Sequence, residues 1–335
     1  MASRIRIAID CMGGDFGLRS SLPAAIKALS LYPDLDLTLV GDSALIDKQL
    51  NHIDHSRLLI VHTDDVVLMT DKPSVALRKK TKSSMRIAID LLQQQKVDAV
   101  VSAGNTGALM AMGCLVLKTL PGIDRPAICS AVPAAGGHCY LLDLGANIES
   151  SAAQLHQFAI MGAALAAVVD GISSPRVALL NIGEEAVKGS EQVKKASALM
   201  AADQQLNYLG YIEGDGLFRG GADVVVADGF VGNVALKVCE GTARFIASAV
   251  KQQFNRSIFT RLAGLLVRPI LKNIYQQLDA EQYNGASFLG LQGVLVKSHG
   301  ASTVDGFVAA IARARLEVSG SVQQIIAQRI AEQIQ

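Results

Sequence analysis

The chain has 335 residues, of which half are apolar and 18% are charged, and its formal net charge at pH 7 is +1. This composition excludes a disordered chain, which would lack the apolar surface that offsets the conformational entropy of folding. A net charge so close to zero argues against a general nucleic-acid binder, which needs a basic field to displace counterions from phosphates.

The mean hydropathy of +0.32 raises the question of a membrane span. The longest uncharged run, 99–117, is interrupted by Gly104 and Gly107. We therefore expect a buried strand, a turn and a buried helix there, because a spanning helix needs about 20 mostly apolar residues. The first residues carry Arg4 and Arg6 and no apolar leader, which favours a cytoplasmic protein.

One pattern recurs along the chain: a short β-branched run, a turn containing glycine, and a longer segment of helical periodicity. The predicted strands cover 4–10, 37–40, 98–103, 140–144, 177–182, 223–228 and 293–296. Of the predicted helices, the first begins near Leu22, the second ends near Leu50 and the third covers 108–118. The fourth follows caps at Ser150 and Ser151 and ends near Val169, and the last three cover 190–202, 234–252 and 303–318.

Strands that are apolar on both faces and alternate with helices predict an α/β fold with a largely parallel sheet. We expect the turns that follow the strands to lie at one edge of this sheet, where open α/β proteins bind ligands. Glycines in these turns, followed by Asn105, Asn147 and Asn233 as expected helix caps, favour an anion such as phosphate.

Several common catalytic motifs are absent from the sequence. It has no GxGxxG after a strand, no GxxxxGK[ST], no GxSxG and no HExxH. The five cysteines form no CxxC pair, and the adjacent His138 and Cys139 would lie on opposite faces of a strand. These absences favour chemistry in which a bound group is itself the nucleophile.

Seven motifs together resemble the PlsX family of phosphate acyltransferases. They are IAIDCMGGDFG at 7–17, SAGNTGALM at 102–110, RPAI at 125–128, LLDLGAN at 141–147, ALLNIGEEAVKG at 178–189, DGFVGNVALKVCEG at 228–241 and VKSHGAS at 296–302. The resemblance implies that inorganic phosphate attacks the thioester of a fatty acyl group on acyl carrier protein, giving acyl phosphate for phospholipid synthesis. It implies no metal and no organic cofactor.

The resemblance also implies a fold and a set of site residues. The fold is a three-layer α/β/α sandwich similar to those of phosphotransacetylases and isocitrate dehydrogenases, working as a homodimer. Lys188 and Asn233 are the expected catalytic residues, as a cation for phosphate and an amide donor. His299 is expected either to protonate the leaving thiolate or to cap a helix or support the site without contacting the substrate. The expected substrate-binding residues are Gly13, Gly14, Asn105, Thr106, Asn147 and Gly232.

Two stretches concentrate positive charge. The first, 72–86, holds six cations and no acid, and is either a solvated face or a docking surface for the acidic carrier protein. The carrier-docking candidates are Arg78, Lys79, Lys80 and Lys82.

The second stretch, 254–278, has apolar residues near helical period with Arg256, Arg261, Arg268 and Lys272 between them. Pro269 predicts a break or a kink that gives two short amphipathic helices, projecting from a single catalytic domain that spans 1–335. Such a pair can lie in a dimer interface or contact an anionic membrane. The membrane candidates are Ile258, Leu262, Leu266 and Arg268.

We therefore expect a cytoplasmic acyltransferase that is peripherally associated with the membrane, where the downstream glycerol-3-phosphate acyltransferase is a further expected partner. Two alternatives remain at this point. One is a phosphotransacetylase-like enzyme acting on acyl-CoA, and the other is a non-catalytic membrane-associated scaffold.

Overall fold

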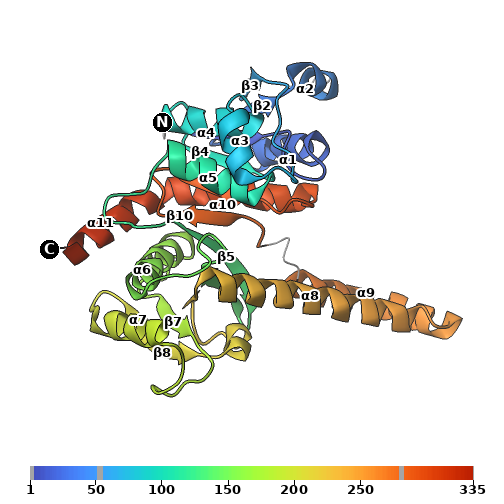
Figure 1. Cartoon of the computed structure of the whole chain (residues 1–335). Helices are drawn as coiled ribbons and strands as arrows, with labels where there is room; N and C mark the ends of the chain where they lie inside the picture. Colours follow the sequence, from blue (N-terminus) through green and yellow to red (C-terminus); the bar gives the residue numbers. More distant parts are fainter. Residues whose placement is uncertain (1–3, 51–55, 279–282, 335) are drawn as a thin grey trace.

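The computed structural model describes residues 4–50, 56–278 and 283–334, except that the side chains of 272–278 and 334 are not described. Its centre is one sheet of eleven strands in the order β3-β2-β1-β4-β11-β10-β5-β6-β9-β7-β8. Figure 1 shows the first group of strands with its helices at the top and the second group at the bottom.

The first group of strands is parallel throughout. It contains β3 (Leu58–His62), β2 (Leu35–Gly41), β1 (Ile5–Asp10), β4 (Ala99–Ser102) and β11 (Val294–Lys297). The second group is also parallel within itself, and contains β6 (Gly137–Leu142), β9 (Val224–Val226), β7 (Arg176–Leu180) and β8 (Asn207–Ile212).

The two groups point in opposite directions. β10 (Ala286–Leu289) is antiparallel to both β11 and β5 (Ala127–Ala134), and β5 forms an antiparallel hairpin with β6. Each antiparallel pairing reverses the direction, and the three reversals leave the second group opposed to the first. The prediction that all strand ends lie at one edge was therefore wrong.

Alternate residues of each strand enter different hydrophobic layers. Ala8, Val100, Leu141 and Val225 face one layer that extends across the whole sheet. This layer is covered by α3 (Pro73–Lys79), α4 (Ser84–Gln93), α5 (Thr106–Val116), the short helix η1 (Gly214–Phe218) and α8 (Gly229–Phe254).

The opposite face is covered by two further helix groups. Ile7, Ile9 and Val101 pack under α1 (Leu18–Leu31), α2 (Ser43–Leu50) and α10 (Val304–Ser319). Leu142, Val177 and Val226 pack under α6 (Ala152–Val169), α7 (Glu191–Ala202) and α11 (Val322–Ile334). Helices on both faces make the three-layer α/β/α sandwich that the sequence predicted.

The uncharged run 99–117 forms β4, a turn and α5, as predicted. α6 is the one helix, among the described residues, that is long and apolar enough to cross a membrane. Ten of its residues are buried, including Phe158 and Met161, which pack in the core against the second group of strands. This burial identifies α6 as a core helix.

α8 and α9 (Ile258–Leu278) form a hairpin that extends beyond the rest of the molecule (Figure 1). The predicted break at Pro269 was wrong, because α9 continues through it and the turn between the helices lies at 255–257. Proline removes one intrahelical hydrogen bond, to the carbonyl of Leu265 four residues earlier. Both residues are exposed, so water can satisfy that carbonyl.

Candidate functional site

Because the two groups of strands are opposed, the predicted site residues divide between two edges of the sheet. The first edge carries the loops after β1, β4 and β11, and therefore Gly13, Asn105 and His299. The second edge carries the loops after β6, β7 and β9, and therefore Lys188 and Asn233. α8 starts at the second edge and crosses to the first, where Lys237 and Glu240 interact electrostatically with His299.

Lys188 lies in the loop between β7 and α7 at the second edge. Its backbone N–H donates to Glu185 O (3.0 Å), and its carbonyl accepts from the Asn181 side chain (3.3 Å). The lysine side chain is exposed, and no described residue forms a hydrogen bond or ion pair with its ammonium group. The fold thus fixes the backbone of Lys188 and leaves its charge available.

Asn233 is not the helix cap that the sequence predicted. α8 begins at Gly229, and its cap is Asp228, whose Oδ1 accepts from Val231 N (2.9 Å). Asn233 therefore lies in the second turn of α8, exposed and beside Gly145, with no hydrogen bond from its amide to a described residue. Because β7 and β9 are neighbours, Asn233 and Lys188 follow adjacent strands at this edge.

Asn147 is also not a helix cap, since Ser151 caps α6 in a capping box with Gln154. The Asn147 amide donates to Pro126 O (2.9 Å) and to Asp143 Oδ2 (3.0 Å). Gly232 packs so closely that a Cβ would lie 2.0 Å from Asp143 O. Both predicted substrate-binding residues are therefore occupied in holding the loop after β6.

Sequence reasoning missed one residue that organises this loop, Asp143, which is fully buried. Its carboxylate accepts from the backbone N–H groups of Ile128 (2.8 Å), Ala146 (3.1 Å) and Asn147 (2.7 Å). Burial raises the pKa of Asp143, and these hydrogen bonds oppose the rise. The motif LLDLGAN contains this aspartate, but only the three-dimensional turn shows what it holds.

Exposed apolar side chains accompany Lys188 and Asn233 on the loops of the second edge and the start of α8. They are Ile148, Ile182, Val187, Phe230, Val231 and Val234. Single exposed apolar residues are ordinary, but several on neighbouring loops mark a surface that binds an apolar group or another chain.

At the first edge, Gly13 and Gly14 contact other loops of the protein. A Cβ on Gly13 would lie 2.5 Å from Asp10 Oδ2, and one on Gly14 would lie 2.9 Å from Gly300 O. Gly14 also has a φ angle of +88°, which residues other than glycine rarely adopt. These contacts explain both glycines by loop packing.

Asn105 is the N-cap of α5, as predicted, with Oδ1 accepting from Ala108 N (3.0 Å). Its amide donates to the carbonyls of Met69 (3.0 Å) and Asp71 (2.9 Å), so the whole side chain is used within the protein. Thr106 is exposed, and its hydroxyl has no hydrogen bond to a described residue. Of this pair, Thr106 is the one free to contact a ligand.

His299 lies in the loop after β11. Its backbone N–H donates to Asn284 Oδ1 (2.9 Å), and its Nδ1 accepts from Ala301 N (3.2 Å), which leaves the hydrogen of a neutral ring on Nε2. Burial lowers the pKa of His299 below its usual value, with Glu240 opposing the change. A neutral His299 is therefore a hydrogen-bond donor at Nε2 rather than a charged acid.

Of the six cations in the stretch 72–86, two are paired. Lys80 contacts Asp65 (2.7 Å) and Arg86 contacts Asp90 (2.8 Å). Lys72, Arg78, Lys79 and Lys82 are exposed, and no described acid pairs with them. They lie on α3 and the loops around it, next to the first edge.

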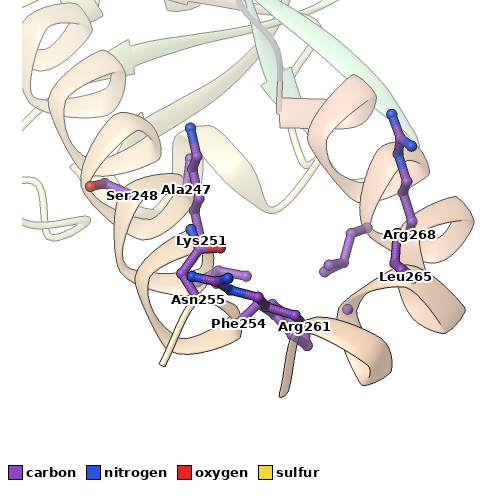
Figure 2. A pocket seen from close by; sticks show the side chains of 11 residues that line it. Ala247, Ser248, Lys251, Phe254, Asn255, Arg261, Leu265 and Arg268 are labelled. Carbon is purple, nitrogen blue, oxygen red and sulfur yellow. The ribbon is translucent and has the colours of Figure 1, made fainter. Parts of the chain in front are cut away.

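A cavity of about 780 Å³ lies between α8 and α9 (Figure 2). Apolar residues including Phe254 and Leu265 line it, together with Lys251, Arg261 and Arg268. No described residue pairs with these three cations. The predicted membrane candidates Ile258, Leu262 and Leu266 are exposed along one side of α9, and Leu266 has 83% of its surface accessible. The side chain of Lys272 lies outside the described residues.

All five cysteines lie in the described part of the chain, and each has a free thiol rather than a disulfide bond. Burial raises the pKa of Cys11 and of Cys139 to about 12, which excludes both as nucleophiles near neutral pH. Within the described part of the chain, no group of three histidine, cysteine or acidic residues is close enough to hold a metal ion.

Comparison with known proteins gives both sequence relatives and structural neighbours. A family model described as "Fatty acid synthesis protein" matches residues 5–325. A protein of Hydrogenovibrio crunogenus named phosphate acyltransferase is 51% identical, with 97% of each chain covered. A protein of Pseudomonas syringae with the same name is also 51% identical, with 98% of this chain and 97% of the relative covered.

Among solved structures, the EutD phosphotransacetylase of Staphylococcus aureus matches with a TM-score of 0.59 at 16% identity, covering 93% of this chain and 94% of that one. A branched-chain phosphotransacylase of Enterococcus faecalis matches with a TM-score of 0.57 at 15% identity, covering 94% of this chain and 99% of the other. At this identity the likeness concerns the fold alone, and it agrees with the three-layer architecture.

Proposed function

The chain belongs to the PlsX family of phosphate acyltransferases, and on that premise we propose that the donor for its transfer of an acyl group to phosphate is the thioester of acyl carrier protein. The observation that carries the activity is the identity of about half the residues over nearly the full length of relatives named phosphate acyltransferase. In the reaction a phosphate oxygen attacks the thioester carbonyl carbon and the C–S bond breaks. The products are acyl phosphate and the carrier thiol, once the thiolate has taken a proton.

Lys188 and Asn233 are the proposed catalytic residues. Phosphate is an anion and its attack creates an oxyanion, so the site needs a cation and aligned donors. The free ammonium of Lys188 and the free amide of Asn233 supply both at adjacent strand ends. The exposed Ile148, Ile182 and Val187 on the neighbouring loops supply a surface for the first methylenes of the acyl chain.

His299 is proposed to act on the leaving thiolate from the first edge. Its Nε2–H can donate a hydrogen bond to sulfur as negative charge develops there. The exposed Arg78, Lys79 and Lys82 are proposed to attract the acidic carrier to this edge, while Lys80 is held by Asp65.

The α8–α9 hairpin is proposed to contact an anionic membrane. It offers exposed Leu262 and Leu266 for the acyl boundary, and the cations Arg261 and Arg268 for lipid headgroups. Such contact would make the protein cytoplasmic but peripherally membrane-associated, and would bring acyl phosphate to a membrane-bound glycerol-3-phosphate acyltransferase.

A homodimer is proposed from a separate feature of α8. Val231, Val234, Val238 and Phe245 are exposed at spacings of three, four and seven residues, which places them along one side of the helix. A second copy covering this stripe would remove it from water. Replacing Val238 by Asp should shift the mass measured by light scattering from dimer to monomer, whereas an unchanged mass would contradict this interface.

The activity test measures acyl phosphate formed from phosphate and either a carrier or a CoA thioester. We expect the carrier thioester to react faster, and Lys188→Ala to lower kcat/KM about a hundredfold, the usual effect of removing one transition-state contact. Full activity of a folded Lys188→Ala protein would remove that residue from the mechanism. A faster reaction with CoA would favour the phosphotransacetylase-like alternative.

The docking test replaces Arg78, Lys79 and Lys82 together by Gln. We expect a lower kcat/KM and a weaker salt dependence with the carrier thioester, and unchanged kinetics with the CoA thioester. Lys48→Gln with Lys96→Gln, two exposed lysines outside this stretch, is the control. Equal losses with both donors would contradict carrier docking.

A further inference from the structure

The last residue of β11, Lys297, carries an ammonium group inside the protein. Only 7% of the residue is accessible to solvent. Nζ donates a hydrogen bond to Ala103 O (3.1 Å) and another to Ser298 O. These two carbonyls belong to different loops, the one after β4 and the one after β11, so the ammonium group joins them.

No described carboxylate forms an ion pair with Lys297. Asp10 lies close enough to attract it electrostatically, but the Asp10 oxygens accept from the hydroxyls of Ser84 (2.6 Å) and Ser102 (2.7 Å). Asp15 also attracts the ammonium group. The charge of Lys297 is thus held by loop carbonyls and by two acids at longer range.

Other hydrogen bonds join the same loops around Lys297. Asp15 N donates to Gly300 O (2.8 Å), and Ser298 N donates to Ser102 O (2.9 Å). The Asn284 amide donates to Ser298 Oγ (2.9 Å) and to Ser302 Oγ (2.8 Å), and Asn284 Oδ1 accepts from His299 N. The loops after β1, β4 and β11 therefore form one connected unit that carries His299.

Packing alone does not account for a lysine at this position. Moving an ammonium group from water into a protein interior costs free energy, and an apolar side chain of similar length would fill the volume without that cost. The two carbonyls that Nζ satisfies would then lack its hydrogen bonds. The ammonium group of Lys297 is therefore placed where its hydrogen bonds and its charge can hold the loops after β4 and β11 together.

We propose that Lys297 is a positioning residue for acyl transfer, whose ammonium group holds the loops after β4 and β11 together and thereby fixes the His299 ring at the first edge. This inference rests on the proposed role of His299 in the reaction. Lys297 acts through the loops and needs no contact with substrate.

Burial lowers the pKa of Lys297 to about 8, while Asp10 and Asp15 oppose the change and Lys237 of α8 adds to it. Together with His299, these are the charged and titratable groups that interact with the ammonium group. Lys297 is therefore charged at pH 7 and loses its charge as the pH rises through about 8. The loops should loosen over the same range.

The test compares Lys297→Met with the wild-type protein in the carrier thioester assay between pH 6.5 and 9.5. At pH 7 we expect kcat to fall about tenfold to a hundredfold, as small misplacements of a reacting group do, with little change in the KM for phosphate. The wild-type rate should fall through a single-proton limb near pH 8, and the variant should lack that limb. Substrate ionisation is common to both proteins and cancels in their ratio.

Lys96→Met, at an exposed lysine, is the matched control and should behave as wild type. Faster amide exchange at 103–105 and 298–302 in Lys297→Met, with an unchanged circular dichroism spectrum, would support loop positioning. If Lys297→Met fails to fold, Lys297→Arg takes its place, because a guanidinium group stays charged across this pH range. A limb near pH 8 that persists unchanged in Lys297→Arg overturns the proposal.

His299→Ala separates the two ideas. If His299→Ala is fully active, the proposed role of His299 fails and Lys297 has no ring to position. If His299→Ala is impaired while Lys297→Met keeps the wild-type kcat and pH profile, the inference about Lys297 is wrong and the role of His299 stands.

Discussion

At the scale of single residues, three asparagines that look alike in the sequence have different environments. The Asn105 amide donates hydrogen bonds to the carbonyls of Met69 and Asp71, and the Asn147 amide donates to the Pro126 carbonyl and the Asp143 carboxylate. Asn233 has no such partner among the described residues and is exposed. A free amide on a fixed helix is suited to a ligand, whereas a satisfied one stabilises the fold.

This difference predicts opposite results for two alanine substitutions. Asn105→Ala should lower the free energy of unfolding by about 2 kcal/mol, because it removes a helix cap and leaves loop carbonyls without a donor. Asn233→Ala should leave stability within about 0.5 kcal/mol and lower kcat/KM at least tenfold. Urea denaturation and the acyl phosphate assay measure the two effects. A stable but inactive Asn105→Ala protein would instead make Asn105 a ligand-binding residue.

Motifs predicted a set of polar residues for the site, but not which of these side chains lack a hydrogen-bond partner within the protein. MGGDFG and GNTG contain glycines that face one another rather than a cavity, and this packing depends on loops 90 or more residues apart in the chain. Lys297 precedes the histidine in VKSHGAS, and its burial follows from the position of β11 in the middle of the sheet. Local sequence carries no information about that position.

At the scale of elements, periodicity predicted seven strands and their helices because each is apolar over several residues and ends at a glycine turn. It missed β3, β5, β8 and β10. The pair Gly136 and Gly137 was a usable signal, because paired glycines favour tight hairpin turns: Ala135 and Gly136 form the turn of the β5–β6 hairpin, and Gly137 begins β6. β10 has only four residues, and it pairs with the next strand, β11, on one side and with the distant β5 on the other, so its place in the sheet could not be read from local sequence.

The α9 helix offers a prediction of its own. Leu266→Glu places a carboxylate at a side chain that is 83% exposed, so the fold should keep its melting temperature. Binding to vesicles of anionic lipid should fall at least tenfold, because the change removes apolar area and adds repulsion. Flotation with vesicles measures this.

Leu45→Glu, at an exposed leucine of α2, is the control and should bind as wild type. The proposed membrane contact is wrong if Leu266→Glu and Leu45→Glu bind vesicles equally well.

At the scale of the whole molecule, a partly buried set of polar side chains joins the two groups of strands. Glu317 of α10 accepts a hydrogen bond from Ser287 of β10. Arg313 of α10 donates to the Tyr140 hydroxyl (2.8 Å) on β6, which donates to Asp170 Oδ1 (3.2 Å) after α6. The network therefore connects the helix that covers the first group to a strand and a helix of the second.

The buried carboxyl group of Glu317 predicts that stability depends on pH. Burial raises the pKa of Glu317 to about 7, with Arg313 opposing the rise, so the folded state binds this proton more tightly than the unfolded state. Its stabilising contribution is complete below about pH 4.5 and is lost as the pH rises toward 7. The loss is on the order of 3 kcal/mol between pH 5 and 8.

Glu317→Gln should remove that dependence, and urea denaturation at several pH values measures it. Glu332→Gln, at an exposed glutamate, should follow the wild-type curve. A wild-type and Glu317→Gln pair whose difference in stability is the same at every pH would show that Glu317 does not titrate in this range.

The place of β11 between β4 and β10 has a consequence for how the chain is made. During synthesis β1 to β4 emerge well before β11, so β4 keeps an unpaired edge until residues 294–297 have been made. The first group of strands can therefore close only after β11 has left the ribosome. A premature stop before Val294 would leave a nascent chain with an exposed, aggregation-prone strand at its centre.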